Sequence, residues 1–215
     1  MRGVNDVILN PETASNDLRL ASPQRIVDWA LESARRPIIT TNFGPYSAVL
    51  LHMVTRACPQ IPVIWADSGY NTRYTYLHAE QMIERLKLNI QVYNPLQSAA
   101  RRNATMGLPE VDDPRHELFT EQVKLEPMRR AMAEAEPDVW LTGIRREQTE
   151  HRKSLDIVTQ DKRGGLVKVA PVFHWSEAQM QAYLDEHDLP NETRYFDPTK
   201  VLDNRECGLH TRRIA

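Results

Sequence analysis

The residue best suited to chemistry in this sequence is a cysteine close to its end, in the run Arg205-Glu206-Cys207-Gly208-Leu209-His210. Three arginines and a histidine surround Cys207 within this short polar stretch and the Thr211-Arg212-Arg213 that follows. Positively charged neighbours favour the thiolate, the reactive form of cysteine, and can lower the thiol pKa from about 8.5 by one or more units. The pattern therefore predicts a reactive thiol.

Two plainer interpretations of Cys207 stay open on the residues alone. The first is an ordinary exposed cysteine on a frayed terminus. The second is half of a zinc site made with His210, which is disfavoured because the other cysteine, Cys58, has no partner at ligand spacing. Cys58 itself is interpreted as a structural residue.

A second group of candidate residues follows the apolar run 138–142, which reads as a buried strand. Four cations occur within nine residues here: Arg145, Arg146, Arg152 and Lys153, just after Gly143. An isolated cluster of this kind is usually a solvated face. Ligands in open α/β sheets, however, lie beyond the carboxyl ends of the strands, and arginine suits the bidentate capture of phosphate or sulfate. The position therefore favours an anion-binding role.

The elements that must position these residues follow a strand–helix–strand rhythm. Ser22-Pro23 starts a helix, and further helices are expected over 48–54, 73–87, 120–135 and 177–187. Strands are expected at 37–41, 62–66, 89–93 and 138–142. Two strand–helix–strand units in series imply an α/β fold with a doubly wound, mostly parallel sheet and helices on both faces. The loops after 37–41, 62–66 and 138–142 should then converge on one crevice.

The first of these loops has the form of an anion site. Thr41-Asn42-Phe43-Gly44 leads from a strand into a helix, an arrangement in which backbone N–H groups face a ligand. The signal is weak alone, since any such turn can hold a glycine. The second loop contains Asp67-Ser68-Gly69-Tyr70.

The remaining segments complete the expected organisation. Residues 97–118 are interpreted as a solvated connection, with a mobile flap as the alternative. Pro127 predicts that helix 120–135 starts late or kinks. A hairpin is expected from residues 155–158 and 166–170. We expect an N-terminal arm or short helix within 1–22, an α/β domain over 23–190 and a mobile catalytic tail over 191–215.

Composition narrows the class of protein. The chain has 215 residues, 41% hydrophobic and 26% charged, with a net charge of −2, which fits one globular domain. It has no basic excess for nucleic acid and no apolar run of membrane length. Two cysteines make no disulfide framework, and the N-terminus does not read as a signal peptide. A reducing, cytoplasmic location is expected.

Five short motifs together resemble a known family. Thr41 to Gly44, Ala66 to Tyr70, Lys124-Leu125-Glu126-Pro127-Met128, Gly143-Ile144-Arg145-Arg146-Glu147-Gln148 and Arg205 to His210 occur in the order seen in the phosphoadenosine phosphosulfate (PAPS) reductases. The resemblance spans about residues 24–210. Each motif is weak alone, but five in order are specific.

This resemblance implies an adenine-nucleotide α-hydrolase-like fold, related to the PP-loop enzymes, and the reduction of PAPS to sulfite. It implies that Cys207 is the nucleophile and forms a cysteine S-sulfonate. Arg205 and His210 would close over the site with it. Residues 41–44 and 67–69, with Gly143, would hold the nucleotide and phosphosulfate, and Arg145, Arg146 and Arg152 would face its phosphates.

The resemblance also implies the partners. Reduced thioredoxin or glutaredoxin would release sulfite, and no cofactor would be tightly bound. The resemblance is also compatible with a homodimer. The Cys-Cys and Cys-x-x-Cys pairs of iron–sulfur adenylyl sulfate (APS) reductases are missing, so no cluster is expected. That favours PAPS, although cluster-free APS reductases exist.

The chain departs from the family pattern in the segment before its tail. Many members carry a longer stretch with Gly-Tyr-x-Ser-x-Gly-Asp there, whereas Asn191 to Arg205 is short. Two further hypotheses therefore stay open: another nucleotide-site enzyme on the same fold, such as an adenylyl- or sulfur-transfer protein, and a non-catalytic nucleotide-binding protein.

Overall fold

The protein is built on one six-stranded sheet in the order β3-β2-β1-β4-β6-β5. The computed structural model describes residues 10–110, 112–160 and 165–200. Its strands are β1 (Pro37–Thr41), β2 (Pro62–Ala66), β3 (Asn89–Tyr93), β4 (Val139–Leu141), β5 (Val158–Gln160) and β6 (Val167–Val169). The first four strands confirm the sequence prediction, and the hairpin is present with β5 placed later than expected.

The sheet is parallel except at one edge. β1 pairs with β2 and β4, β2 with β3, and β4 with β6, all in parallel, while β5 runs antiparallel to β6. The chain winds outward from β1 to β3 and then returns to place β4 on the other side of β1. The doubly wound prediction is therefore confirmed, and the switch point lies between β1 and β4.

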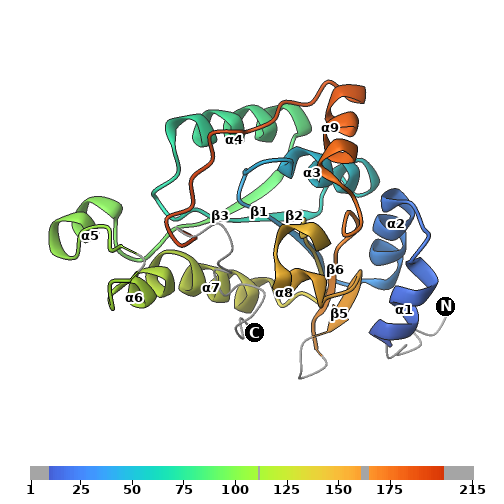
Figure 1. Cartoon of the computed structure of the whole chain (residues 1–215), viewed down its shortest axis with the longest axis horizontal. Coiled ribbons are helices and arrows are strands. Elements are labelled where there is room, and N and C mark those ends of the chain that lie inside the picture. The colour runs from blue at the N-terminus through green and yellow to red at the C-terminus, as the bar shows by residue number, and fades with distance from the viewer. Residues whose placement is uncertain (1–9, 111, 161–164, 201–215) are drawn as a thin grey trace.

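Helices cover both faces of the sheet (Figure 1). Their bounds are α1 (Pro11–Leu18), α2 (Pro23–Ser33), α3 (Ser47–Ala57), α4 (Arg73–Leu86), α5 (Ala99–Thr105), α6 (His116–Thr120), α7 (Glu126–Ala135), α8 (Glu150–Lys153) and α9 (Glu177–Glu186).

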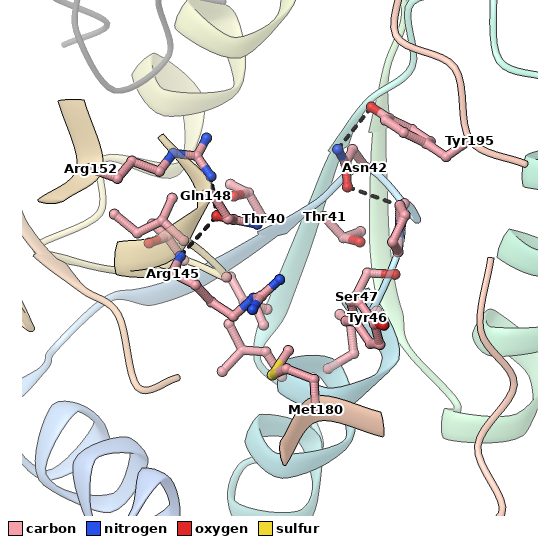
Figure 2. Close-up of a pocket in the computed structure, with 18 of the residues that line it drawn as sticks. Thr40, Thr41, Asn42, Tyr46, Ser47, Arg145, Gln148, Arg152, Met180 and Tyr195 are labelled. Carbon is pink, nitrogen blue, oxygen red and sulfur yellow. Dashed lines mark hydrogen bonds between the residues drawn. The ribbon is translucent and has the colours of Figure 1, made fainter. Parts of the chain in front are cut away.

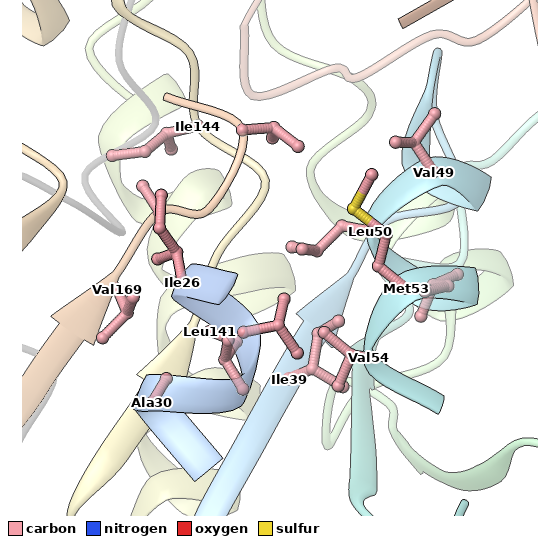
Figure 3. Close-up of a cluster of buried hydrophobic side chains, with 14 of the residues drawn as sticks. Ile26, Ala30, Ile39, Val49, Leu50, Met53, Val54, Leu141, Ile144 and Val169 are labelled. Carbon is pink, nitrogen blue, oxygen red and sulfur yellow. The ribbon is translucent and has the colours of Figure 1, made fainter. Parts of the chain in front are cut away.

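The strands bury apolar side chains on both faces, as parallel strands do. Ile39 and Leu141 join the larger core, in which α2 and α3 contribute Ile26 and Val54 (Figure 3). Because side chains alternate along a strand, the neighbouring Ile38 points the other way, into a smaller cluster with Met128 and Met132 of α7 and Trp140 of β4. The two cores clamp the central strands and fix the positions of the loops that leave them.

The N-terminal segment contains a helix that completes the sheet edge. Asn10 caps α1 by accepting hydrogen bonds from the amides of Glu12 and Thr13. Ser15 is buried on α1, and its hydroxyl both donates to the carbonyl of Val158 (3.1 Å) and accepts from its amide (3.0 Å). Of the two alternatives for this segment, the short helix is therefore the one observed.

Two predictions for the middle of the chain need refinement. Residues 97–118 form a mostly exposed connection, as predicted, but they are not irregular throughout, because they contain α5 and the start of α6. Ser98 caps α5 by accepting from the amide of Arg101. The kink expected at Pro127 is a π-helical turn, Glu121–Leu125, just before α7. Proline lacks an amide hydrogen and clashes with the carbonyl four residues back, which a widened turn relieves.

Candidate active site

A crevice of about 1030 Å³ opens at the carboxyl ends of β1 and β4. The loops after these strands line it, together with residues of α9 and Tyr195 (Figure 2). Lys124 lines it as well. The predicted site residues among its lining are Thr41, Asn42, Gly44, Gly143, Arg145 and Arg152. The predicted convergence of the first and third loops is thus observed at the switch point of the sheet.

The loop after β1, residues 42–46, is held by hydrogen bonds between near neighbours. The Thr41 hydroxyl accepts from the amide of Phe43 (3.0 Å), and Asn42 Oδ1 accepts from the amide of Gly44 (3.1 Å). Phe43 and Tyr46 take positive φ angles of 50° and 62°, a strained conformation for residues with a side chain. We call this segment the β1 loop.

Phe43 has a different place from its neighbours in the motif. Its ring is fully buried and meets Trp65 edge-on, with ring centroids 4.9 Å apart. The side chain therefore anchors the β1 loop to the core and does not line the crevice.

The β1 loop delivers the N-terminus of α3 to the crevice. Ser47 begins this helix and lines the crevice, where the positive end of the helix dipole favours an anion. The hydroxyls of Ser47 and Thr142 are buried and have no hydrogen-bond partner among the described residues. Such unpaired groups are costly, and a ligand in the crevice offers a partner. Neither residue stood out in the sequence.

Arg145 is buried at the crevice wall among acidic and aromatic partners. Its guanidinium ion-pairs with Glu147 and with Glu177 of α9 (3.5 Å), donates to the carbonyl of Trp175 (3.3 Å) and lies 5.6 Å from the Tyr46 ring centroid. Its charge is shared with two carboxylates, so Arg145 also ties α9 to the loop after β4.

The other two predicted arginines differ from each other. Arg152 is buried on α8, lines the crevice and donates to Gln148 Oε1. Gln148 Oε1 also accepts from the amide of Arg145 (2.9 Å), which fixes the whole turn (Figure 2). Arg146 is exposed, does not line the crevice, and is held through its backbone amide to Phe173 (2.8 Å).

The loop after β2 stands apart from the crevice lining. Asp67 is buried and accepts from the amide of Gly69 (2.9 Å), from Asn71 Nδ2 (2.8 Å) and from the Tyr76 hydroxyl (3.0 Å). Burial and the charge of Asp67 raise the pKa of Tyr76 to about 12. Asp67, Ser68 and Gly69 thus build a turn at the crevice end of the sheet, and none of the three lines the crevice itself.

Sequence reasoning missed a buried ion pair beside the crevice. Lys124 belongs to the motif Lys124 to Met128, but its sequence context offers no reason to assign it a role. Its ammonium contacts Asp197 Oδ2 and lies 3.3 Å from the Thr199 hydroxyl. Burial would raise the pKa of Asp197, but the charge of Lys124 and hydrogen bonds from Lys124 and Thr199 lower it to about 2. No local sequence signal pairs positions 124 and 197.

The predicted residues of the tail, Arg205, Cys207 and His210, lie outside the described residues. The roles assigned to them stay predictions. Cys58 is partly buried and packs against the larger core.

Two absences hold for the part of the chain that is described. It contains no group of three or more His, Cys, Asp or Glu side chains arranged to hold a metal ion. None of its helices has both the length and the apolar character needed to cross a bilayer.

The parallel sheet, the glycine-containing β1 loop and the cation-bearing crevice define an α/β protein of the adenine-nucleotide α-hydrolase-like, PP-loop related class. Solved structures of this class share the fold. A PAPS reductase from Candida auris, in a phosphate complex, superposes with a TM-score of 0.74 at 24% identity, covering 89% of this chain and 91% of that one. An FMN adenylyltransferase from Candida glabrata gives 0.56 at 13% identity, covering 84% and 63%.

Sequence comparison narrows the class to one family. The family described as "Phosphoadenosine phosphosulfate reductase domain" matches residues 36–197. A phosphoadenosine 5'-phosphosulfate reductase from Synechocystis is 40% identical over 88% of this chain and 76% of its own length. One from Xylella fastidiosa is 36% identical over 93% of both. This chain therefore belongs to the phosphoadenosine phosphosulfate reductase family, a family of oxidoreductases that act on sulfur groups.

Proposed function

We propose that the protein reduces PAPS to sulfite and adenosine 3',5'-bisphosphate, using Cys207 as the nucleophile in assimilatory sulfate reduction. The observation that carries this proposal is the crevice at the β1/β4 switch point, in a chain that matches PAPS reductases over most of its length. The crevice brings a helix N-terminus and two arginines of the predicted anion site together, as a polyanionic nucleotide requires.

The chemistry is two successive displacements. The Cys207 thiolate attacks the sulfate sulfur of PAPS, an S–S bond forms, and the bond from that sulfur to the phosphate oxygen breaks. Adenosine 3',5'-bisphosphate leaves with the electron pair of that bond. A thiolate of reduced thioredoxin or glutaredoxin then attacks the Cys207 sulfur, and sulfite leaves. The donor's second thiol resolves the mixed disulfide, so the donor is oxidised and the sulfur of sulfate is reduced.

The residues around the crevice divide this work. Arg152 and the N-terminus of α3 would face the phosphates. Arg145, already paired with Glu147 and Glu177, would order the wall that the nucleotide meets. Arg205 and His210 would arrive with Cys207. No step needs a metal or tightly bound cofactor, and the partners proposed are PAPS and the dithiol donor.

The test is to incubate the reduced protein with PAPS and, in parallel, with APS, and to weigh the intact chain. A gain of one sulfonate on Cys207 with PAPS, absent in Cys207→Ser, is the expected result. Sulfonation by APS alone would move the substrate assignment to APS. Binding of nucleotide without a mass gain would point to a non-catalytic protein. Turnover that survives Cys207→Ser would point to another nucleotide-site enzyme.

The control variant is Cys58→Ser, which removes the second thiol of the chain. It should be sulfonated like the unchanged protein. Loss of labelling in Cys58→Ser but not in Cys207→Ser would contradict the assignment of the nucleophile.

A further inference from the structure

Residues 191–200 run as an extended segment from α9 past α4 (Figure 1), and we call this segment the strap. The strap contains no helix or strand, yet its contacts are specific. Asn191 Oδ1 accepts from the amide of Tyr46 (2.8 Å), and the Pro198 carbonyl lies 3.1 Å from His116 Nε2. Tyr195 and Lys200 both line the crevice.

Tyr195 joins the strap to the β1 loop. Its hydroxyl accepts from Asn42 Nδ2 (2.8 Å), as Figure 2 shows. A Cβ added to Gly44 would lie 3.2 Å from the Tyr195 ring, so only glycine allows this approach without a shift. Asn42 Oδ1 accepts from the backbone amide of Gly44. The oxygen and the nitrogen of the Asn42 side chain are therefore both hydrogen-bonded within the protein. Asn42 thus holds the strap.

Asp197 joins the strap to Lys124, which also lines the crevice. The side chains of Lys124 and Asp197 are 10% and 7% exposed. Thr199, itself buried, donates to Asp197 Oδ1 through its hydroxyl (2.6 Å) and its amide (3.0 Å). The Tyr195 hydroxyl lies 3.4 Å from Asp197 Oδ2, so one continuous chain of polar contacts runs from the β1 loop through the strap to Lys124.

This arrangement sets where the C-terminal tail starts. The strap ends at Lys200, on the crevice lining, and Cys207 follows seven residues later. Seven residues span at most about 25 Å. Whatever path the chain takes, Cys207 can lie no farther than that from Lys200, which is why the placement of the strap bears on delivery of the thiol.

We propose that Asp197 and Tyr195 are positioning residues for the reaction, acting by docking the strap between Lys124 and Asn42. Asp197 also shields the Lys124 ammonium with an ionised carboxylate, so it competes with any anion that approaches this lysine. The inference rests on the proposed function, because it concerns delivery of Cys207 to a bound sulfate donor.

Docking and shielding have opposite effects on the reaction. Removing the Asp197 charge takes away the carboxylate that offsets the Lys124 charge, so affinity for adenosine 3',5'-bisphosphate stays equal or rises. The same change loosens the strap, so the first-turnover rate of sulfonation falls by about tenfold or more, since small misplacements of reacting groups are costly. A general loss of folded structure would instead weaken binding and rate together.

The experiment compares Asp197→Asn with Asp188→Asn in the full reduced chain. Asp188 is an exposed carboxylate after α9 that pairs only with Arg85 among the described residues (3.3 Å), which makes it a matched control. Single-turnover sulfonation by PAPS is followed by quenching and weighing. Binding of adenosine 3',5'-bisphosphate is measured by calorimetry. Tyr195→Phe, which keeps the ring, and Thr199→Val test the same contacts without changing a charge.

The expected result is a slower rate with unweakened affinity in Asp197→Asn, a smaller loss of rate in Tyr195→Phe and Thr199→Val, and no change in Asp188→Asn. A rate in Asp197→Asn equal to that of the control overturns the inference, as does a parallel loss of affinity and rate. If Asp197→Asn fails to fold, unchanged rates in the other two variants overturn it. If PAPS leaves the wild-type chain unmodified, the proposed function itself is contradicted.

Discussion

The β1 loop and the strap border the same crevice but are held in different ways. The β1 loop is tied by bonds between residues two apart, such as Asn42 to Gly44. The strap is tied by bonds that join residues 73 to 153 positions apart, from Lys124 to Asp197 and from Asn42 to Tyr195. The β1 loop therefore has local contacts of its own, whereas the position of the strap depends on residues far away in the sequence. Changes in the residues that hold the strap should therefore affect the site more than the short length of the strap suggests.

The largest effect on stability is expected from Lys124→Met. This change leaves the Asp197 carboxylate buried without its cation, and breaking a buried ion pair from one side costs about 3–5 kcal/mol. Urea unfolding measures the loss. The double variant Lys124→Met with Asp197→Asn should recover much of it, and additive losses would show that the pair is not coupled.

Gly44→Ala tests the contact between the two segments. The added methyl would lie 3.2 Å from Asn42 Oδ1 and from the Tyr195 ring, so one of them must shift. Overpacking of this kind costs about 1–3 kcal/mol, read from urea unfolding. Gly107→Ala does not serve as a control because Gly107 has a positive φ. The control is Gly143→Ala, whose added methyl would meet only Leu50, at 4.0 Å, so its loss of unfolding free energy should be smaller. Equal losses in both would contradict close packing of the strap on Gly44.

Asp197 should make stability depend on pH in acid. Its pKa in the folded protein is lowered to about 2, below the value of about 3.9 in unfolded chains. The stability that its carboxylate adds, about 2.5 kcal/mol, is thus present above pH 4 and is lost as pH falls from 4 to 2. The difference in unfolding free energy between the wild type and Asp197→Asn should shrink over that range. A difference that stays constant would contradict the pair.

The smallest effect is expected from Tyr195→Phe. It removes the hydrogen bond from Asn42 and keeps the ring beside Gly44, so the unfolding free energy should fall by about 0.5–1.5 kcal/mol. The matched control is Tyr74→Phe on α4, which removes a hydroxyl from a half-exposed residue and keeps the ring that lies 4.1 Å from the Arg194 guanidinium. A loss no larger than that of the control would mean that the two segments are joined by packing alone.

The same contrast explains what the sequence could predict. The central strands and the β1 loop were predicted because their signals are local: apolar runs, a glycine, and a serine or threonine cap. Pro127 likewise marked its own kink. α5 has no apolar stripe, so its sequence does not predict a helix, and short helices depend on tertiary support. The helix predicted from residue 120 begins earlier, with α6 at His116.

Residues whose role depends on distant partners could not be assigned from local pattern. Arg145 was expected to face phosphate, but its partner Glu177 comes from α9. Phe43 belongs to the motif that is predicted to hold the nucleotide, and yet it packs in the core. Lys124 and Asp197 each look unremarkable alone, and only the fold brings them together beside the crevice.

The central claim is that a thiol near the C-terminus accepts the sulfo group of a nucleotide held in the β1/β4 crevice. Peptide mapping after a single exposure of the reduced chain to PAPS tests it most directly. The account predicts a sulfonate on the peptide that contains Cys207, released as sulfite when a reduced dithiol protein is added. An unmodified Cys207 in protein that demonstrably binds the nucleotide would contradict it.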